Sequence, residues 1–357
     1  MHVRSNRHVR ARLEVLFGAL AFAASVPAGK LLLRGASPLA LSGGLYLAAG
    51  LLCALLIGID AMGGLGERNR LAGREWLWMG GAVLLGGMLG PLALFYGLRL
   101  TDGYVAGLLL NLEAVFTVGL GVLVSGERVG PRGFAAIALV IAGAALLAGA
   151  VRADQGATHP LGALLVVAAC ACWGLDNNFT QRISVRDARQ IVAIKGVAGG
   201  VAILAIATAL GQLGAWSAAR FASVALLGSV SYGLSIVLFV RGLRELGVVH
   251  TATLFALAPG FASLLSWLIL RETVRGGAVA ALALMSGGAL LLASDVHEHE
   301  HTHEPLEHAH VHEHDEHHQH EHTPEELAQV PHAHRHRHGR LTHSHPHTHD
   351  IHHRHKH

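Results

Sequence analysis

Charged residues and cysteines are scarce in this 357-residue sequence. Asp, Glu, Lys and Arg together make up 14% of it, compared with about 25% of an ordinary soluble domain. The three cysteines, Cys53, Cys170 and Cys172, all lie in apolar runs, so we expect small core residues rather than disulfide bridges. Hydrophobic residues account for 52% of the chain. These proportions exclude a soluble enzyme, a disulfide scaffold and a disordered protein as descriptions of the whole chain.

Long apolar runs fill most of the sequence. Each is about 18–23 residues long, the length that crosses roughly 30 Å of hydrocarbon as a helix. A buried soluble helix is the alternative for any one run, but ten runs joined by short gaps predict an all-α membrane protein with ten transmembrane helices. The predicted spans are Leu13–Leu33, Leu39–Ile59, Trp76–Leu98, Tyr104–Ser125, Gly133–Val151, Leu161–Phe179, Ile191–Leu213, Phe221–Val240, Val248–Leu270 and Gly276–Ala293.

The first span also begins like a secretory signal peptide, with basic residues followed by an apolar stretch. That stretch has about 20 residues, whereas a signal core has about 7–15. We therefore expect it to remain in the protein as a transmembrane helix.

Arginines are distributed unequally between alternate gaps. With the N-terminus inside, the inside gaps hold fourteen arginines and the outside gaps hold six. Cytoplasmic loops favour Lys and Arg, so we expect a multi-pass protein of the inner (plasma) membrane with both termini in the cytoplasm. The excess of basic residues is therefore explained by orientation in the lipid bilayer, and we expect no nucleic-acid partner. The six outside arginines are Arg34, Arg99, Arg152, Arg220, Arg271 and Arg275.

The two halves of the chain repeat each other. The triplet Gly97-Leu98-Arg99 recurs 145 residues later as Gly242-Leu243-Arg244, and Glu127 matches Glu272 at the same shift. Each repeat holds five spans, so the second must enter the membrane from the opposite side. Inverted repeats of this kind are typical of secondary transporters, where they provide two alternative packings around a central site.

The predicted organisation has five parts. They are a basic cytoplasmic N-terminus (1–12), a first repeat of five helices (13–151), a linker (152–160), a second repeat of five helices (161–294) and a His-rich disordered tail (295–357).

Several motifs resemble the EamA family of the drug/metabolite transporter superfamily, over about residues 13–294. They are the segments 97–101, 108–116 and 126–129 in the first repeat, 242–246, 257–261 and 271–274 in the second, and Cys172-Trp173-Gly174. The resemblance implies a ten-span carrier whose relatives move amino acids, other metabolites and drugs. The chain departs from the pattern at Ala114, where many relatives have proline, and in having Glu14 only at the mouth of the first span. The small multidrug relatives have a carboxylate deep in the first span. Its absence here argues against proton-coupled cation exchange by that particular device.

Polar side chains inside the spans are the candidate solute-binding residues, since an ionisable group at mid-helix costs about 2.5–3.5 kcal/mol on insertion scales. A buried carboxylate paired with a neighbouring helix is the alternative for Glu113. Helix-to-helix hydrogen bonding is the alternative for the run at 176–178, and a satisfied polar residue is the alternative for His250. The candidates are Glu113, Asn111, Asp176, Asn177, Asn178, Trp173, Lys30 and His250.

Other residues are given structural roles. We expect Lys195 to snorkel to the interface and Tyr96 and Tyr232 to anchor span ends. Glu127 and Glu272 are expected to have structural roles beside a nearby arginine. The glycine pairs Gly86/Gly90 and Gly196/Gly200 predict close helix packing.

Histidines dominate the tail, where many alternate with other residues. Alternate residues of an extended chain share one face, and imidazole suits Zn, Ni, Co and Cu, so the tail predicts exchangeable metal sites. An expression tag and a pH-responsive polyelectrolyte are the alternatives. The candidate ligands are His297, His299, His301, His303, His308, His310, His312, His314, His332, His334, His336, His338, His343, His345, His347 and His349.

No nucleotide-binding, triad or redox motif occurs in the sequence. We therefore expect no enzyme activity, no required cofactor, and transport driven by a gradient or by exchange. The predicted function is export of a small metabolite or drug-like solute by a monomer or homodimer with a metal-binding tail. The alternatives are a divalent metal (Ni/Co/Zn) exporter and a membrane-anchored metal store or sensor.

Overall fold

The computed structural model divides the chain into a helical unit, Met1–Asp295, and a tail unit that begins at Val296. Secondary structure is described for residues 2–62, 71–125, 129–152, 159–183, 186–246, 248–274, 276–293, 297–303, 306–312, 332–338 and 341–347.

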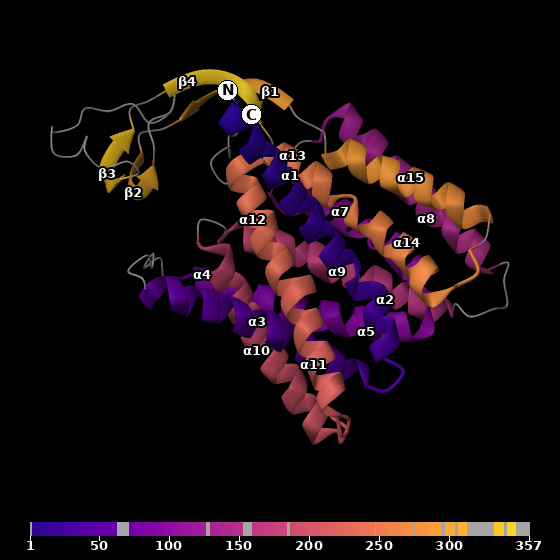
Figure 1. Cartoon of the computed structure of the whole chain (residues 1–357). Coiled ribbons are helices and arrows are strands. Elements are labelled where there is room, and N and C mark those ends of the chain that lie inside the picture. Colours follow the sequence, from indigo (N-terminus) through magenta and orange to yellow (C-terminus); the bar gives the residue numbers. More distant parts are fainter. Residues whose placement is uncertain are drawn as a thin grey trace. The chain divides into compact units, whose positions relative to one another are not determined.

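The helices of the first half, coloured indigo to magenta in Figure 1, form five helical segments. The first is α1 (His2–Ala23) with α2 (Ser25–Leu32), and the second is α3 (Pro38–Met62). The third is α4 (Glu75–Ala82), the π-helix η1 (Val83–Leu89) and α5 (Gly90–Leu100). The fourth is α6 (Gly103–Leu109), α7 (Leu112–Leu120) and the π-helix η2 (Gly121–Ser125), and the fifth is α8 (Pro131–Arg152).

The second half repeats this order. Its segments are α9 (Pro160–Gln181), α10 (Ala188–Ala209), then α11 (Ala218–Leu227) with the π-helix η3 (Gly228–Leu234) and α12 (Ser235–Leu246), then α13 (Val248–Phe255) with α14 (Ala258–Leu270), and finally α15 (Gly276–Ala293). Among the described residues, nine segments are long and apolar enough to cross a membrane, and a tenth, Gly277–Leu292, is shorter. The prediction of a helical membrane protein with two repeats is confirmed.

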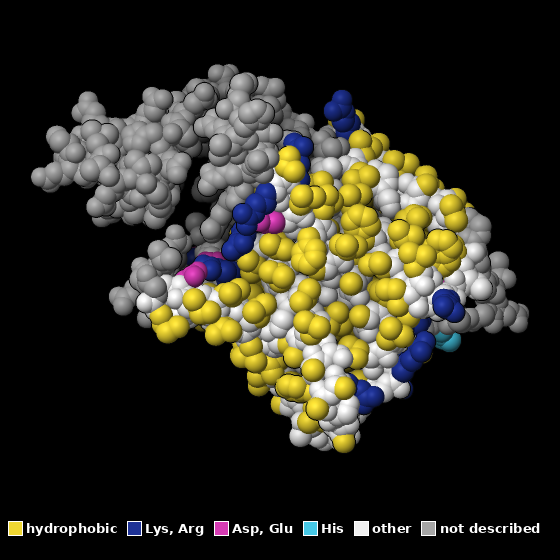
Figure 2. Space-filling view, viewed as in Figure 1, with side chains coloured by type: hydrophobic (Ala, Val, Ile, Leu, Met, Phe, Trp, Pro, Cys, Tyr) yellow, Lys and Arg dark blue, Asp and Glu magenta, His cyan; other side chains and the backbone are white. Residues whose placement is uncertain are grey.

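Large apolar side chains cover the outside of the helical unit. Leu13, Leu55, Leu77, Phe134 and Leu164 are each about 60–73% exposed. Figure 2 shows such side chains spread over the whole visible face, with Lys and Arg at its margins. A soluble monomer rarely exposes so large an apolar surface, whereas hydrocarbon is its natural solvent.

Helix packing is symmetric between the two halves. α3 packs on α10, and α8 packs on α15. The contact of α5 with α9 is matched by that of α12 with α1, and the contact of α7 with α9 by that of α14 with α1. Likewise η1 packs on α10 while η3 packs on α3. Exchanging each segment for its counterpart in the other repeat therefore leaves the pattern unchanged, as two equivalent repeats require.

Irregular turns fall at matched positions too. The π-helices Val83–Leu89 and Gly228–Leu234 are offset by 145 residues, the same shift as the sequence repeat. The fourth segment breaks at 110–111 and the ninth at 256–257. Pro259 follows the second break, but Ala114 follows the first, so the break does not require a proline.

Glycines allow the closest helix contacts. A Cβ on Gly196 would lie 2.6 Å from the Tyr46 carbonyl oxygen and one on Gly200 would lie 2.6 Å from the Leu47 nitrogen. The predicted close packing at this pair is confirmed.

The tail unit contains four short strands. β1 (His297–His303) pairs antiparallel with β4 (Leu341–His347), and β2 (Leu306–His312) pairs antiparallel with β3 (His332–His338). A strict two-residue alternation suits extended chains, which is the physical reason why these segments align with each other.

Candidate functional site

A polar cluster lies between the fourth and sixth segments. Asn177, on α9, donates a hydrogen bond from Nδ2 to Glu113 Oε1 (3.0 Å) and another to Thr117 Oγ1 (3.1 Å), both on α7. Glu113 and Asn177 are partly buried. The structure thus brings together two predicted site residues and adds Thr117, which lies one helical turn after Glu113. That spacing was the sequence signal that could have identified it.

Asp176 forms an ion pair with Lys195 of α10. The distance from Asp176 Oδ2 to Lys195 Nζ is 2.5 Å, and Thr180 Oγ1 donates to Asp176 Oδ1 (3.0 Å). Asp176 is only 4% exposed, and a buried carboxylate needs a partner of opposite charge. The prediction that Lys195 snorkels to the interface is wrong, because this partner holds it inside the bundle.

The π-helix η1 packs directly against this ion pair. A Cβ on Gly86 would lie 1.9 Å from Asp176 Oδ2, and one on Gly90 would lie 2.7 Å from the indole nitrogen of Trp173. That indole donates to the Gly86 carbonyl oxygen (3.3 Å). Glycine is required at these positions because no other residue leaves room for Asp176 and Trp173.

Aromatic rings continue from the cluster into the second repeat. Tyr46 interacts with Trp173 and lies within electrostatic range of Asp176 and Glu113. Its ring is 5.3 Å from that of Tyr232, which in turn is 5.8 Å from that of Phe22. Tyr232 is 5% exposed and belongs to η3. The prediction that it anchors a span end at the interface is therefore wrong.

Two asparagines have structural partners. Asn178 Nδ2 donates to the carbonyl oxygens of Thr117 (3.0 Å) and Gly174 (2.8 Å), which is the helix-to-helix alternative for this position. Asn111 is 2% exposed, and its Nδ2 donates to the Leu108 carbonyl oxygen (2.9 Å) at the break between α6 and α7. The Oδ1 atom of Asn111 is buried without a hydrogen-bond partner in the described structure.

Lys30 lies away from this cluster, at the end of α2. Its Nζ is 3.5 Å from Glu272 Oε1, and it also donates to the Thr101 carbonyl oxygen. Glu272 accepts hydrogen bonds from the backbone nitrogens of Gly103 (2.8 Å) and Tyr104 (2.9 Å), where the positive end of the α6 dipole favours a carboxylate. The partner of Glu272 is thus a lysine and a helix start rather than the expected arginine.

A left-handed residue directs Glu272 to this position. Arg271 has φ 53° and ends α14. A bulky residue rarely adopts this conformation without a compensating contact. The contacts of Glu272 with α6 and Lys30 supply that compensation.

Sequence reasoning missed a set of ion pairs at the opposite end of the bundle. Two guanidinium nitrogens of Arg186 donate hydrogen bonds to both carboxylate oxygens of Glu75, and the shortest distance is 2.9 Å. Arg189 bridges Asp60 and Asp187. These pairs connect the end of the second segment and the start of the third with the loop between the sixth and seventh segments and the start of the seventh, so they join one repeat to the other.

Three predictions fall outside the described side chains. His250 lies on α13, but its side chain is outside the described residues, and so are those of the tail histidines and Glu127. Among the side chains that are described, no group of three or more His, Cys, Asp or Glu is placed to hold a metal ion.

Two repeats of five helical segments around paired charges inside an apolar bundle define a helical membrane carrier. The chain belongs to the EamA-like transporter family, whose sequence model matches residues 11–149 and 160–294. The resemblance inferred from the motifs is therefore confirmed.

The chain is similar to a curated relative and to solved structures. The relative, from Methanothermobacter thermautotrophicus, is described as an uncharacterized transporter and is 28% identical over 272 residues, covering 73% of this chain and 79% of the relative. One solved structure, described only as a crystal structure of a protein, has a TM-score of 0.57 at 20% identity and covers 79% of this chain and 96% of that one. This second likeness supports the fold alone.

Proposed function

We propose that the protein is a secondary transporter that exports a small organic solute, a metabolite or drug-like molecule, through alternating access. The observation that carries the proposal is the cluster of Glu113, Asp176 and Lys195 inside an otherwise apolar bundle. Charged groups are costly in that setting and mark solute or proton pathways in membrane proteins. The chain contributes helices from both repeats to this cluster.

The charges of the cluster favour a cationic group or a proton. Two carboxylates, Glu113 and Asp176, share the cluster with a single cation, Lys195, whose ion-pair partner is Asp176. A solute ammonium or a proton at Glu113 balances the excess negative charge. The adjacent rings of Trp173 and Tyr46 provide apolar and cation–π contacts for an organic solute.

The ion pairs at the two ends of the bundle suit alternating access. Lys30–Glu272 joins the first and ninth segments at one end, and Glu75–Arg186 joins the third segment with the loop after the sixth at the other. Inverted repeats exchange two packings around a fixed site. We propose that each state keeps one set of pairs and opens the other.

A proteoliposome assay tests the transporter proposal. Purified protein is reconstituted, and uptake of radiolabelled amino acids, polyamines and cationic dyes is measured with and without a proton gradient. Glu113→Gln should lower the rate of the transported solute at least about tenfold, as expected when a charged contact is lost. The matched control is Glu14→Gln, a carboxylate within α1 that is paired with Arg10, which should stay within about twofold of the wild type. Equal rates in both variants would contradict the assignment of the cluster.

We also propose that the tail binds divalent metal ions. The strand registers place His297 opposite His347 and His299 opposite His345 in one ribbon, and His308 opposite His336 in the other. Imidazole ligands in register suit Zn, Ni, Co and Cu. The proposed location of the tail is the cytoplasm.

Cellular metal content separates the alternatives. Cells under Ni, Co or Zn load express the full chain, a chain ending at Asp295, or full-length Glu113→Gln, and their metal content is measured by mass spectrometry. Lower content in the wild type that both variants lose supports a metal exporter. Higher content that depends only on the tail supports a metal store. Unchanged content with all three chains removes the metal exporter.

A further inference from the structure

A pocket of about 310 Å³ lies at the end of the bundle where α2 and α5 end and α3 begins. It is lined by residues 33–37 and 212–214, together with Arg99 and Trp216. No acidic residue is among them. The polar cluster of the transport site shares no residue with this pocket.

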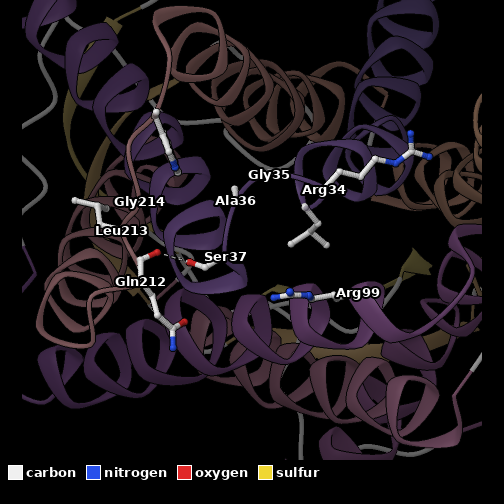
Figure 3. A pocket seen from close by; sticks show the side chains of 10 residues that line it. Arg34, Gly35, Ala36, Ser37, Arg99, Gln212, Leu213 and Gly214 are labelled. Atoms are coloured by element: carbon white, nitrogen blue, oxygen red, sulfur yellow. Dashed lines mark hydrogen bonds between the residues drawn. The ribbon is translucent and has the colours of Figure 1, made fainter.

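Arg99 is the charged side chain aimed into the pocket. Figure 3 shows its guanidinium extending beneath Ser37 toward Gln212, whereas Arg34 extends away from them. Arg99 is exposed, and within the described part of the chain no ion pair or hydrogen bond holds its guanidinium. It closes the repeated Gly-Leu-Arg motif, whose Gly97 packs against the Gly162 carbonyl oxygen. In this motif Gly97 therefore serves helix packing, whereas the charge of Arg99 has no partner among the described residues.

A second cation, Arg220, lies next to Gly35, one of the residues that line the pocket. A Cβ on Gly35 would lie 2.2 Å from Nη2 of Arg220, so glycine leaves the space that this guanidinium occupies. Ser37 begins α3 by accepting a hydrogen bond from the Ala40 nitrogen (3.0 Å), and it donates to the Gln212 carbonyl oxygen (2.7 Å). The positive end of the α3 dipole thus adds to the charge of the two arginines.

Trp216 supplies an unused donor. Its Nε1 is buried and has no hydrogen-bond partner in the described structure, while the far edge of its ring packs on Gly44 of α3. A buried N–H without a partner costs free energy. An acceptor atom in the pocket removes that cost.

We propose that this pocket binds an oxyanion, a carboxylate or phosphate group, through the Arg99 and Arg220 guanidinium groups and the Trp216 indole N–H. Guanidinium groups match the planar geometry of carboxylates and the oxygens of phosphates. The same chemistry is carried by a free anionic solute and by the headgroup of an anionic lipid. This site is separate from the proposed transport site, so a negative result in the transport assay would leave the oxyanion proposal standing.

Binding of inorganic phosphate to the full-length protein in nanodiscs of neutral phosphatidylcholine tests the proposal. Wild-type protein should bind radiolabelled phosphate saturably. Arg99→Gln should weaken binding at least about tenfold, and Trp216→Phe by about threefold to tenfold, because they remove a charged and a neutral donor. Arg74→Gln is the matched control, an exposed arginine at the opposite end of the same helical segment, and should stay within about twofold.

Nanodiscs that also contain phosphatidylglycerol identify the source of the anion. Loss of phosphate binding in these discs, restored by neutral lipid, assigns the pocket to a lipid headgroup, whereas unchanged binding assigns it to a free anion. The proposal is overturned if wild-type protein binds no phosphate saturably in neutral discs, or if Arg99→Gln and Arg74→Gln bind it equally.

Discussion

The two repeats share a backbone but not a chemistry. Glu113 and Thr117 on the fourth segment correspond, at the 145-residue shift, to Ala258 and Ala262 on the ninth. In the π-helices, Gly87 of η1 corresponds to Tyr232 of η3. At this position η1 lies close to the backbone of α10, where a Cβ on Gly87 would be 3.0 Å from the Lys195 carbonyl oxygen, whereas η3 carries an aromatic ring. Symmetry provides two packings, and the asymmetric side chains provide the single solute site that we propose.

The largest predicted effect tests the ion pair that only one repeat possesses. Lys195→Met leaves the Asp176 carboxylate buried without a partner, so we expect the free energy of unfolding to fall by about 3–5 kcal/mol. The measurement is unfolding by SDS titration in mixed micelles. Adding Asp176→Asn should restore all but about 1 kcal/mol, and a double variant no more stable than the single one would contradict the pairing.

The next effect sharpens the contrast between the π-helices. Gly86→Ala places a Cβ against Asp176, so we expect a loss of about 1–3 kcal/mol from overpacking. Gly80→Ala is the matched control on the preceding turns, where nothing lies within 4 Å of the new Cβ. It should gain about 0.5–1 kcal/mol from helix propensity. The same SDS titration measures both, and the comparison fails if the two variants change stability alike.

A smaller change makes the fourth segment resemble the ninth. Thr117→Ala removes the hydroxyl that accepts from Asn177, and we expect a loss of about 0.5–1.5 kcal/mol. Thr208→Ala is the control, since the hydroxyl of Thr208 bonds only its own helix at an exposed position. Reconstituted transport should fall with Thr117→Ala and stay unchanged with Thr208→Ala. Unchanged transport in both would separate Thr117 from the site.

The smallest effect concerns the exposed pair Arg10–Glu14 at the start of the chain. Arg10 is 80% exposed in its side chain, and surface pairs of this kind contribute about 0.3–0.5 kcal/mol. Arg10→Gln should therefore change stability by no more than that and less at high salt. A loss above about 1 kcal/mol in the same titration would show that this end of the helix carries a structural contact.

The fold was accessible to sequence reasoning because hydropathy, span length and the Gly-Leu-Arg repeat are one-dimensional signals. Glu113 and Asp176 were found by the same route, since a charge inside an apolar run is visible in the sequence. Lys195 and Tyr232 were misassigned because their roles depend on partners on other helices, Asp176 and Tyr46. Thr117 was missed although its spacing of one helical turn from Glu113 could have identified it. The Glu75–Arg186 pair was missed because charges at helix ends are common and carry no pattern of their own.

The sequence by itself determined a membrane protein of two repeats, because apolar runs of spanning length leave few alternatives to helices in lipid. It also determined which buried positions carry charge. Only the tertiary structure decided which of these charges meet. Asp176 pairs with Lys195 and Lys30 with Glu272 because helix packing, fixed by glycines such as Gly86 and Gly196, brings distant segments within hydrogen-bond distance. The pairing of charges is a property of those contacts, which no single segment encodes.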